Sequence, residues 1–490
     1  MLSNIQLENF QGFGEKVEVP LRPLTLIFGP NASGKSSIIR SLLLQEQSLG
    51  PRDFGPFGAN GFIFEGPSIS LASFANVVHK HDEDASIKMA FTTKVFAPRS
   101  NQTGYIENHL SSLSIEYTIG IQAPFSAIRF EAQGKNNEDP MVLEFEFLQR
   151  KGLVLRRLEG EELLSKLLSS SSTSFLVRRN AETESRESVN NAIEYLRSTL
   201  NSREDYSLRG NFPTVSGARS RSENADERER GAGLVDTLLN SFRLLTLREF
   251  RNVGHVGPLR KIEARLNYTG GLALDEEDFD STDSRSRDGS VSEQIVSDWF
   301  YQLSGSRYRL KPVSFYAEKV RFLGSLEVQI VVDTLTDTPV TFSDVGVGLS
   351  QVLPVLRAIA PSTANGLLRA PRLALIEQPE LHLHPKMQAD LASLFAEIVS
   401  SNRGTQIIAE THSEAMLLRI QKKIRDGELE PNLVQILFVD KYEIATSDQS
   451  GETDDSKRGN RVLALDMDAD DEFSVQLPLS FTKLRMSDLL

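Results

Sequence analysis

Residues 29–36 have the types and the spacing of a loop that binds phosphate. They read Gly-Pro-Asn-Ala-Ser-Gly-Lys-Ser and match G-x-x-x-x-G-K-[ST] at every defined position. The apolar run LTLIF at 24–28 predicts a buried strand before the loop, and a helix is predicted after it over 36–44. In such a loop Lys35 reaches the β- and γ-phosphates of a nucleotide, and the Ser36 hydroxyl binds Mg²⁺.

The physical reason for this residue pattern is local. Glycines let the backbone N–H groups point at phosphate oxygens, and the helix N-terminus adds partial positive charge. A glycine turn with an incidental lysine is the alternative, but the flanking strand and helix argue against it. The candidate nucleotide-binding residues are Gly29, Pro30, Asn31, Ala32, Ser33, Gly34, Lys35, Ser36 and Ser37.

A second apolar run, LALI at 373–376, ends in acidic residues. A carboxylate at a strand end beside a phosphate loop holds Mg²⁺, so Glu377 and Ser36 are the predicted metal ligands. Gln378 stands where a general base is expected, but glutamine can only orient a water and cannot accept its proton. Glu380 is the nearby candidate for the missing carboxylate. A strand that ends at the surface in solvated acids is the alternative.

A histidine follows a further predicted strand at 406–409. His412 can donate a hydrogen bond to a γ-phosphate or to the attacking water, or it can simply cap the next helix. Glu380, His382 and His384 also suggest a metal site. Alternation along an extended turn does not aim three ligands at one point, however, so no such site is expected there.

Together these motifs resemble ABC-type ATPase heads of the SMC, RecF and OLD-like branch. The resemblance rests on GPNASGKS, LALIEQPELHLHP and AETHSE, with SDVGVGLSQ at 343–351 ahead of the acidic strand. It also includes IQLENF and HVGPLR, and it covers about 1–150 and 250–480. The sequence is most similar to stand-alone bacterial AAA-type ATPases, many of which belong to phage-defence systems, such as the ATPase component of PARIS-type systems.

The resemblance implies ATP as the nucleotide and a role for each motif. Gly346, Gly348 and Ser350 would form the signature segment, which in such heads completes the γ-phosphate site of a second protomer across a dimer. His412 would be the switch histidine. Glu377 replaces the usual Asp, and Gln378 at the base position makes slow hydrolysis the expectation, with Glu380 or a residue of a partner assisting.

The predicted fold class is α/β: an ABC-type P-loop ATPase head, with a mixed β lobe and a parallel-sheet lobe, that carries a mainly helical insertion. The amino-terminal part of the head is expected over 1–150 and the insertion over 151–250. The second part of the head is expected over 251–430, and a small β-rich piece over 431–490. Polar loops are predicted at 216–233 and 274–289, where apolar periodicity is missing.

An acidic run at 466–470 resembles the D-x-D that holds metals in TOPRIM nucleases. Too little of the chain follows it for the rest of such a domain. Position 471 is Asp where a calcium-binding loop requires glycine. A solvated acidic turn is therefore expected there.

The 490 residues carry a formal net charge of −13 and no cysteine. The charge excludes a chain that coats nucleic acid along its whole surface, although a local basic groove remains possible. The absence of cysteine excludes disulfides, a thiolate nucleophile and Cys-ligated zinc. Because no secretory signal or membrane-spanning run is present, a cytoplasmic protein without a membrane partner is expected.

Three functions compete at this point. The first is a regulatory ATPase that assembles as a homo-oligomer, a dimer or a ring of dimers, and controls a separate effector, a nuclease, in anti-phage defence with a phage-derived trigger. The second is a repair or chromosome-handling ATPase that acts directly on DNA. The third is a scaffold that binds ATP but barely hydrolyses it, because of Gln378. The arginines nominated for DNA are Arg178, Arg179, Arg219, Arg221, Arg228 and Arg230.

Overall fold

The computed structural model describes most of the chain. The described residues are 1–49, 62–96, 106–121, 126–135, 138–148, 152–175, 181–202, 206–209, 211–215, 226–250, 252–258, 260, 289–316, 325–340, 342, 345–364, 367–369, 373–401, 404–442 and 459–465. Several sequence features lie outside these ranges: residues 216–225 of the polar loop predicted at 216–233, residues 274–288 of the one predicted at 274–289, Arg178, Arg179, Arg219, Arg221, Ser343, Asp344 and the acidic run at 466–470. The end of the first predicted loop is wrong, because helix α5 (Glu227–Phe250) begins there and buries Gly231, Ala232 and Gly233.

The chain divides into two compact units. The first comprises Met1–Leu21, Ala32–Arg251 and Val439–Val462, and the second comprises Arg22–Asn31, Asn252–Phe438 and Leu463–Leu490. The boundary between Asn31 and Ala32 falls inside the predicted phosphate loop.

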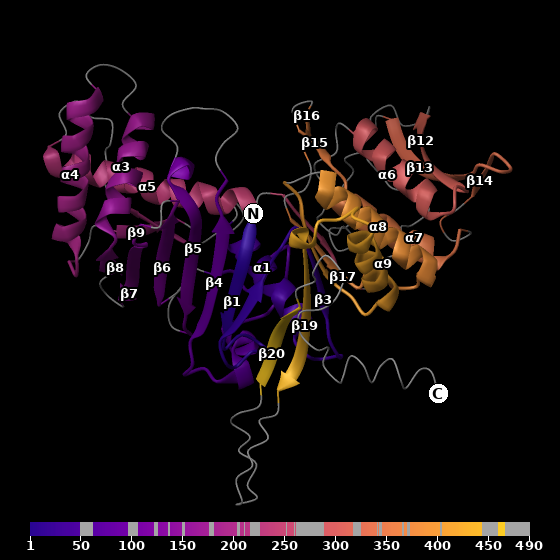
Figure 1. Ribbon diagram of the computed structural model, residues 1–490, viewed down its shortest axis with the longest axis horizontal. Helices are drawn as coiled ribbons and strands as arrows, with labels where there is room; N and C mark the ends of the chain where they lie inside the picture. The colour runs from indigo at the N-terminus through magenta and orange to yellow at the C-terminus, as the bar shows by residue number, and fades with distance from the viewer. Residues whose placement is uncertain are drawn as a thin grey trace, which may run out of the picture. The chain divides into compact units, whose positions relative to one another are not determined.

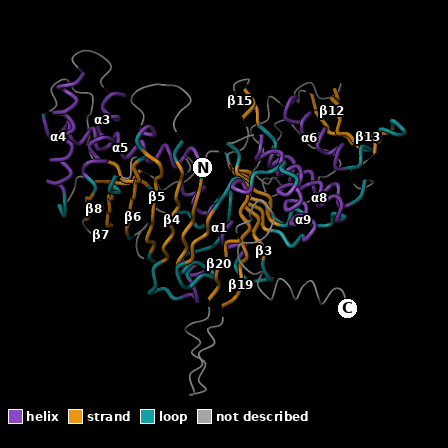
Figure 2. Tube along the Cα trace, in the orientation of Figure 1, coloured by secondary structure: helices purple, strands orange, loops and turns teal. Residues whose placement is uncertain are grey.

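The first unit is built on an antiparallel sheet, which contains nine strands among the described residues, in the order β10-β9-β8-β7-β6-β5-β4-β1-β2 (Figures 1 and 2). Strand neighbours in sequence pair antiparallel from β4 to β10, and between β8 and β9 the connection contains the helices α3 and α4. The strands are β1 (Leu2–Glu8), β2 (Val17–Pro20), β4 (Ile87–Lys94), β5 (Leu110–Ile119), β6 (Ala127–Gly134), β7 (Met141–Leu148), β8 (Gly152–Glu159), β9 (Tyr206–Arg209) and β10 (Phe212–Val215).

Helices of this unit pack against the sheet through aromatic side chains. Phe242 of α5 stacks on Phe130 of β6, with ring centroids 5.7 Å apart, and Phe130 also meets Phe145 and Phe212. All four rings are buried, so they anchor the helical segment to the strands. The helical elements are α1 (Lys35–Leu49), α2 (Phe74–Val77), η1 (His79–His81), η2 (Ile106–Asn108), α3 (Glu161–Phe175), α4 (Ala181–Thr199) and α5 (Glu227–Phe250).

The second unit is built on a mainly parallel sheet with the order β11-β17-β18-β3-β19-β20. All neighbours from β11 to β19 run parallel, and the side chains of β3, β17 and β18 are almost entirely buried, as is typical of the central strands of a covered sheet, whereas β11 is mostly half-buried. The strands are β3 (Leu24–Phe28), β11 (Val253–Val256), β17 (Leu373–Glu377), β18 (Gln406–Glu410), β19 (Val434–Tyr442) and β20 (Gly459–Leu465).

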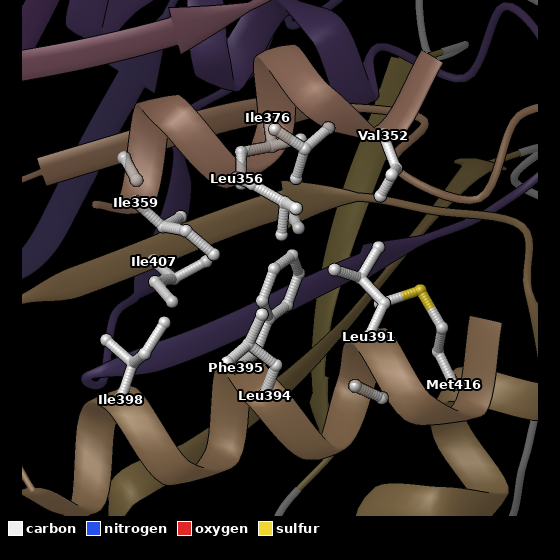
Figure 3. Packing of buried hydrophobic residues seen from close by; sticks show 14 of the residues in the cluster. Val352, Leu356, Ile359, Ile376, Leu391, Leu394, Phe395, Ile398, Ile407 and Met416 are labelled. Atoms are coloured by element: carbon white, nitrogen blue, oxygen red, sulfur yellow. The ribbon is translucent and has the colours of Figure 1, made fainter. Parts of the chain in front are cut away.

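Helices of this unit pack on one face of the sheet and form a single core with it. Figure 3 shows Val352 and Leu356 of one helix and Leu391 and Phe395 of another directed toward the strand residues between them. Phe395 is fully buried and belongs to the same apolar cluster as the strands. The helical elements are α6 (Gly289–Leu303), α7 (Val347–Ile359), α8 (Pro385–Ser401), α9 (Glu414–Arg425) and η3 (Pro431–Leu433).

Two small sheets complete the described part of the second unit. One has three strands, β12 (Tyr308–Tyr316), β13 (Ser325–Asp333) and β14 (Thr338–Val340), and the other pairs β15 (Ser362–Ala364) with β16 (Leu367–Arg369). None of the helices in the described ranges is both long enough and apolar enough to span a bilayer. The predicted α/β class, with one β-rich part and one parallel-sheet part, is confirmed by the large antiparallel sheet of the first unit and the mainly parallel sheet of the second.

Candidate nucleotide-binding site

Three neighbouring parallel strands of the second unit bring motif residues to one edge of its sheet. β3 ends at Phe28 and continues into the phosphate loop, β17 ends at Glu377, and β18 ends at Glu410 just before His412. β18 lies between the other two strands, with Glu410 opposite both Glu377 and Ile27. Because parallel strands leave the sheet at the same edge, the acidic turn, His412 and the start of the loop meet there.

The phosphate loop has the backbone that its glycines predict. Gly29, Ala32 and Gly34 have φ values of 145°, 58° and 97°, a region that favours glycine. A Cβ atom at Gly34 would lie 2.8 Å from Asn460 Nδ2 and 3.3 Å from Phe13 Cζ. Gly34 is therefore needed for its conformation and for space. Asn460 and Phe13, which pack on the loop here, were not among the predicted site residues.

The helix that follows the loop starts at the predicted lysine. Lys35 is the first residue of α1 and is 3% exposed, while Ser36 is half-buried. Ser33 and Ser37 are buried, and Ser33 Oγ has no hydrogen-bond partner among the described residues. A helix N-terminus behind a positive-φ loop, with a buried hydroxyl awaiting a partner, fits a phosphate group.

Glu377 is held in place from the neighbouring strand. His255 of β11 places its Nε2 atom 3.1 Å from Glu377 Oε1. The Glu377 side chain remains 13% exposed, so it is accessible at the edge of the sheet. Carboxylate and hydroxyl oxygens are the ligands that Mg²⁺ prefers, and this ion takes one or two protein carboxylates together with substrate phosphates. The carboxylate of Glu377 fits that pattern.

The acidic turn after β17 has a constrained backbone. Gln378 has φ 49°, its N–H donates to Glu410 O at 2.8 Å, and its carbonyl accepts from Arg260 Nη2 at 2.7 Å. His382, further along, also has a positive φ of 61°. Such strained non-glycine residues cost on the order of 1–3 kcal/mol each and cluster at functional sites.

Glu380 connects the acidic turn to the loop that carries His412. Its Oε1 atom accepts a hydrogen bond from the His412 N–H at 2.6 Å. Its Oε2 atom is buried and has no hydrogen-bond partner in the part of the chain that the structure describes. One oxygen of this carboxylate is therefore structural, and the other is available to a further group.

The neighbouring histidines do not join Glu380 in a ligand cluster. His382 and His384 are exposed, whereas Glu380 is half-buried against the His412 loop. Among the described residues no group of three or more His, Cys, Asp or Glu side chains is arranged to hold a metal ion.

The predicted signature residues lie at the start of α7. Gly346 is the N-cap with φ 94° and is exposed together with Val347. Ser350 is buried, and its hydroxyl donates within its own helix to the carbonyls of Gly346 and Val347. The groups exposed at the N-terminus of α7 therefore belong to Gly346 and Val347, and the Ser350 hydroxyl is not exposed there.

The HVGPLR segment at 255–260 contains two residues of the site that the motif patterns do not predict, His255 and Arg260. The structure places His255 on Glu377 and Arg260 on the carbonyls of Glu377 and Gln378. Burial lowers the pKa of Arg260 to about 10, and the nearby charge of Glu380 opposes that shift. No local signal marked these roles, because the partners are more than 100 positions away in the chain.

The model of the AAA ATPase domain matches residues 1–206 and 158–417, two overlapping parts that include the phosphate loop, the acidic turn and His412. The chain belongs to the AAA ATPase domain family. No curated protein sequence matches this AAA ATPase.

Solved structures give a weak likeness to this AAA ATPase. An SmcHead bound to the C-winged helix domain of ScpA is 12% identical with a TM-score of 0.41, covering 96% of this chain and 98% of its own. An Smc head domain with an extended coiled coil, bound to the C-terminal domain of ScpA and derived from Pyrococcus furiosus, is 12% identical at a TM-score of 0.40, with 100% and 99% covered. The SMC head domain from Thermotoga maritima is 9% identical at 0.33, with 94% and 98% covered.

Proposed function

We propose that this AAA ATPase binds ATP with Mg²⁺ at the carboxyl edge of β3, β18 and β17 and hydrolyses it slowly. The observation that carries the proposal is this edge, where the phosphate loop leaves β3, Glu377 ends β17 and His412 follows the strand between them. Residues 29–37 hold the phosphates, Lys35 neutralises their charge, and Ser36 with Glu377 holds Mg²⁺, which stabilises negative charge on the phosphates when bound.

The residues at the acidic turn support slow turnover. Gln378 has a fixed backbone and a side chain that can orient a water but cannot take its proton. Glu380 Oε2 is a buried carboxylate oxygen that can accept a hydrogen bond from that water, or a residue of a partner assists. His412, on the loop that Glu380 holds, donates to the γ-phosphate or to the water.

The exposed start of α7 supports assembly into a homo-oligomer. Gly346, Gly348 and Ser350 form a helix N-terminus whose outer residues face solvent. In the proposed oligomer, a dimer or a ring of dimers, this N-terminus faces the γ-phosphate held by a second protomer, where its partial positive charge is stabilising.

The proposed role is regulatory, in the cytoplasm. ATP-dependent assembly holds a separate effector, a nuclease, and a phage-derived trigger releases it. This part of the proposal rests on the resemblance of GPNASGKS and IEQPELHLHP to stand-alone defence ATPases. Direct action on DNA is the alternative. It depends on arginines of which four lie outside the described residues, and Arg228 lies over the ring of Tyr195.

Steady-state ATP turnover of the purified protein, with and without duplex DNA, tests the proposal. Lys35→Ala is the blank, and Lys88→Ala, which removes a partly exposed lysine paired with Glu8 far from the predicted motifs in sequence, is the matched control. We expect slow turnover that is indifferent to DNA, lost in Lys35→Ala and kept in Lys88→Ala. Strong stimulation by DNA would favour direct action on DNA, and a wild-type rate equal to that of Lys35→Ala would leave only an ATP-binding scaffold.

Purification of the protein together with the products of its neighbouring genes tests the effector. A second protein that stays bound in ATP and leaves when the trigger is added would support the regulatory role. Repeated purification without any second protein would contradict it.

A further inference from the structure

Arg260 gathers backbone carbonyls from three separate segments of the second unit. Its Nη2 atom donates to Glu377 O at 2.8 Å and to Gln378 O at 2.7 Å, and its Nη1 atom donates to Gln351 O at 3.0 Å. Its Nε atom donates to Gly257 O at 3.2 Å. One planar guanidinium therefore joins the acidic turn after β17 to helix α7.

The connection runs in both directions. Gln351 Nε2 donates to Arg260 O at 3.0 Å, so each of the two residues uses its side chain to bind the backbone of the other. Gln351 follows the signature residue Ser350 in the first turns of α7 and is 5% exposed. We call this reciprocal pair, Arg260 and Gln351, the clamp.

Helix α7 needs such external support near its start. Residue 354 is proline, which lacks the N–H that would bond the Ser350 carbonyl in a regular helix. The Ser350 hydroxyl already donates to the carbonyls of Gly346 and Val347. The first turns of α7 are thus short of one internal hydrogen bond, and the clamp supplies contacts from outside the helix.

The start of α7 and the acidic turn after β17 also contact each other directly. A Cβ atom on Gly348 would lie 2.5 Å from His382 O, so the start of α7 touches the end of the acidic turn. Within that turn Glu380 holds the His412 N–H. The signature segment, the acidic turn and the His412 loop are therefore linked by an unbroken series of contacts within one unit.

We propose that Arg260 and Gln351 are positioning residues that make the signature segment move together with the acidic turn. The clamp holds Glu377 and Gln378 by their carbonyls and so sets where their side chains point. Through Gln351 it ties that arrangement to the helix end offered to a second protomer. The effect on turnover rests on the proposed function, whereas the mechanical link between the two segments does not.

Two conservative variants test the clamp. Arg260→Lys keeps the charge but loses the planar fork, and Gln351→Met keeps the shape but removes the donor. We expect kcat to fall on the order of 10–100-fold in each, as for residues that orient metal and substrate ligands, while ATP affinity changes little. In the double variant the losses should not multiply, because both changes break one unit.

Arg22→Lys is the matched control. Arg22 Nη1 also bridges two backbone carbonyls, those of Pro431 and Val434, but at the start of β3 and β19, the opposite end of the strands. Its loss should lower stability and leave kcat unchanged. Wild-type kcat in Arg260→Lys and Gln351→Met, with turnover still abolished in Lys35→Ala, would overturn the clamp and leave the proposed function standing.

Amide hydrogen exchange tests the clamp without any activity. Gln351→Met should speed exchange in peptides covering 346–353 and 377–383 together, and leave 24–28 unchanged, because loss of the donor loosens both linked segments. Faster exchange in only one of the two segments would overturn the clamp. If wild-type turnover equals that of Lys35→Ala, the proposed function fails and this exchange experiment still decides the clamp.

Discussion

Gln378 is the residue on which the proposed turnover rate depends. Its backbone is fixed by a positive φ, by the bond of its N–H to Glu410 O and by the bond of its carbonyl to Arg260. Gln378 differs from a general base only in its side chain, because an amide cannot accept a proton as a glutamate carboxylate does. Glu380, two residues later, accepts a hydrogen bond from the His412 N–H with Oε1, and its Oε2 atom has no hydrogen-bond partner among the described residues.

Gln378→Glu should therefore raise kcat by about 10-fold or more, because a positioned general base contributes on the order of 10²–10⁴ to a rate. Steady-state turnover measures the effect. Gln302→Glu, which adds the same charge on the exposed face of α6, is the control and should change nothing. An unchanged rate in Gln378→Glu would show that Gln378 is not the brake, and an unchanged rate in Glu380→Gln would remove Glu380 from the reaction.

Tyr117 makes the stability of the folded state depend on pH in the alkaline range. It is fully buried, Gln45 Nε2 donates to its hydroxyl at 3.3 Å, and burial raises the pKa of the phenol above its usual value of about 10. The folded state therefore prefers the protonated form more strongly than the unfolded chain does. Stability from this group is complete below about pH 10 and is lost as the pH rises further.

Tyr117→Phe should lose less stability than the wild type above about pH 10, because it has no phenol to ionise. Each pH unit is worth up to about 1.4 kcal/mol for one proton. Urea unfolding at a series of pH values between about 8 and 11 measures the free energy of unfolding of both proteins. Parallel pH profiles for the two proteins would contradict the assignment.

At the scale of elements, the start of α7 depends on a glycine that approaches another segment closely. Gly348 faces the carbonyl of His382, and no positive φ is required of it. The constraint is therefore one of space between the helix and the acidic turn. It is a contact between backbone segments, which cannot give way as a flexible side chain would.

Gly348→Ala should lower the free energy of unfolding by about 1–3 kcal/mol, the usual cost of adding a methyl group where there is no room. Gly257→Ala is the control, since a Cβ atom there meets nothing within 4 Å and the backbone needs no positive φ. Chemical denaturation followed by circular dichroism compares the two. Equal stability of both variants would show that α7 can shift away from His382 at no cost.

At the scale of the whole molecule, the proposed oligomer requires the exposed start of α7 to meet a nucleotide. Val347 is 51% exposed at that helix end, directly after the N-cap Gly346. An apolar side chain there is compatible with a neighbouring phosphate, whereas a carboxylate would repel it.

Val347→Glu should abolish ATP-dependent assembly and leave ATP binding by the protomer intact. Sedimentation velocity with and without ATP measures the assembly. Leu335→Glu is the matched control, since Leu335 is 76% exposed in the turn between β13 and β14 and should tolerate the charge. If Val347→Glu assembled at the same ATP concentration as the wild-type protein, the interface between protomers would lie elsewhere.

Much of the fold around the phosphate loop could be predicted from short stretches of sequence. The run LTLIF forms β3 over the predicted residues, and the predicted helix after the loop is α1. The prediction ended α1 too early, at 44, because Gln45, Gln47 and Ser48 look like solvent-facing residues. They are buried instead, since Gln47 and Ser48 bond the backbone of Ile63 and Ile69.

Strands that form only by pairing with neighbours are harder to predict from the sequence than the elements around the phosphate loop. The sequence predicts a mainly helical insertion over 151–250, yet β9 and β10 form a hairpin within it and extend the antiparallel sheet beyond β8. Each strand has only four residues, too few for an apolar period to be distinguished from a loop. Their strand conformation comes from hydrogen bonds to neighbours, which local sequence does not report.

The sequence by itself determined the phosphate loop, the acidic strand end and the expected place of His412, because each is a local motif whose chemistry needs adjacent residues in a set order. Only the tertiary structure decided which residues hold those motifs. Apart from Gly257, the partners of Arg260 lie 91 to 118 positions away, and His255 reaches Glu377 across 122 positions. Such contacts arise from parallel strand register and helix packing, which no spacing within the sequence encodes.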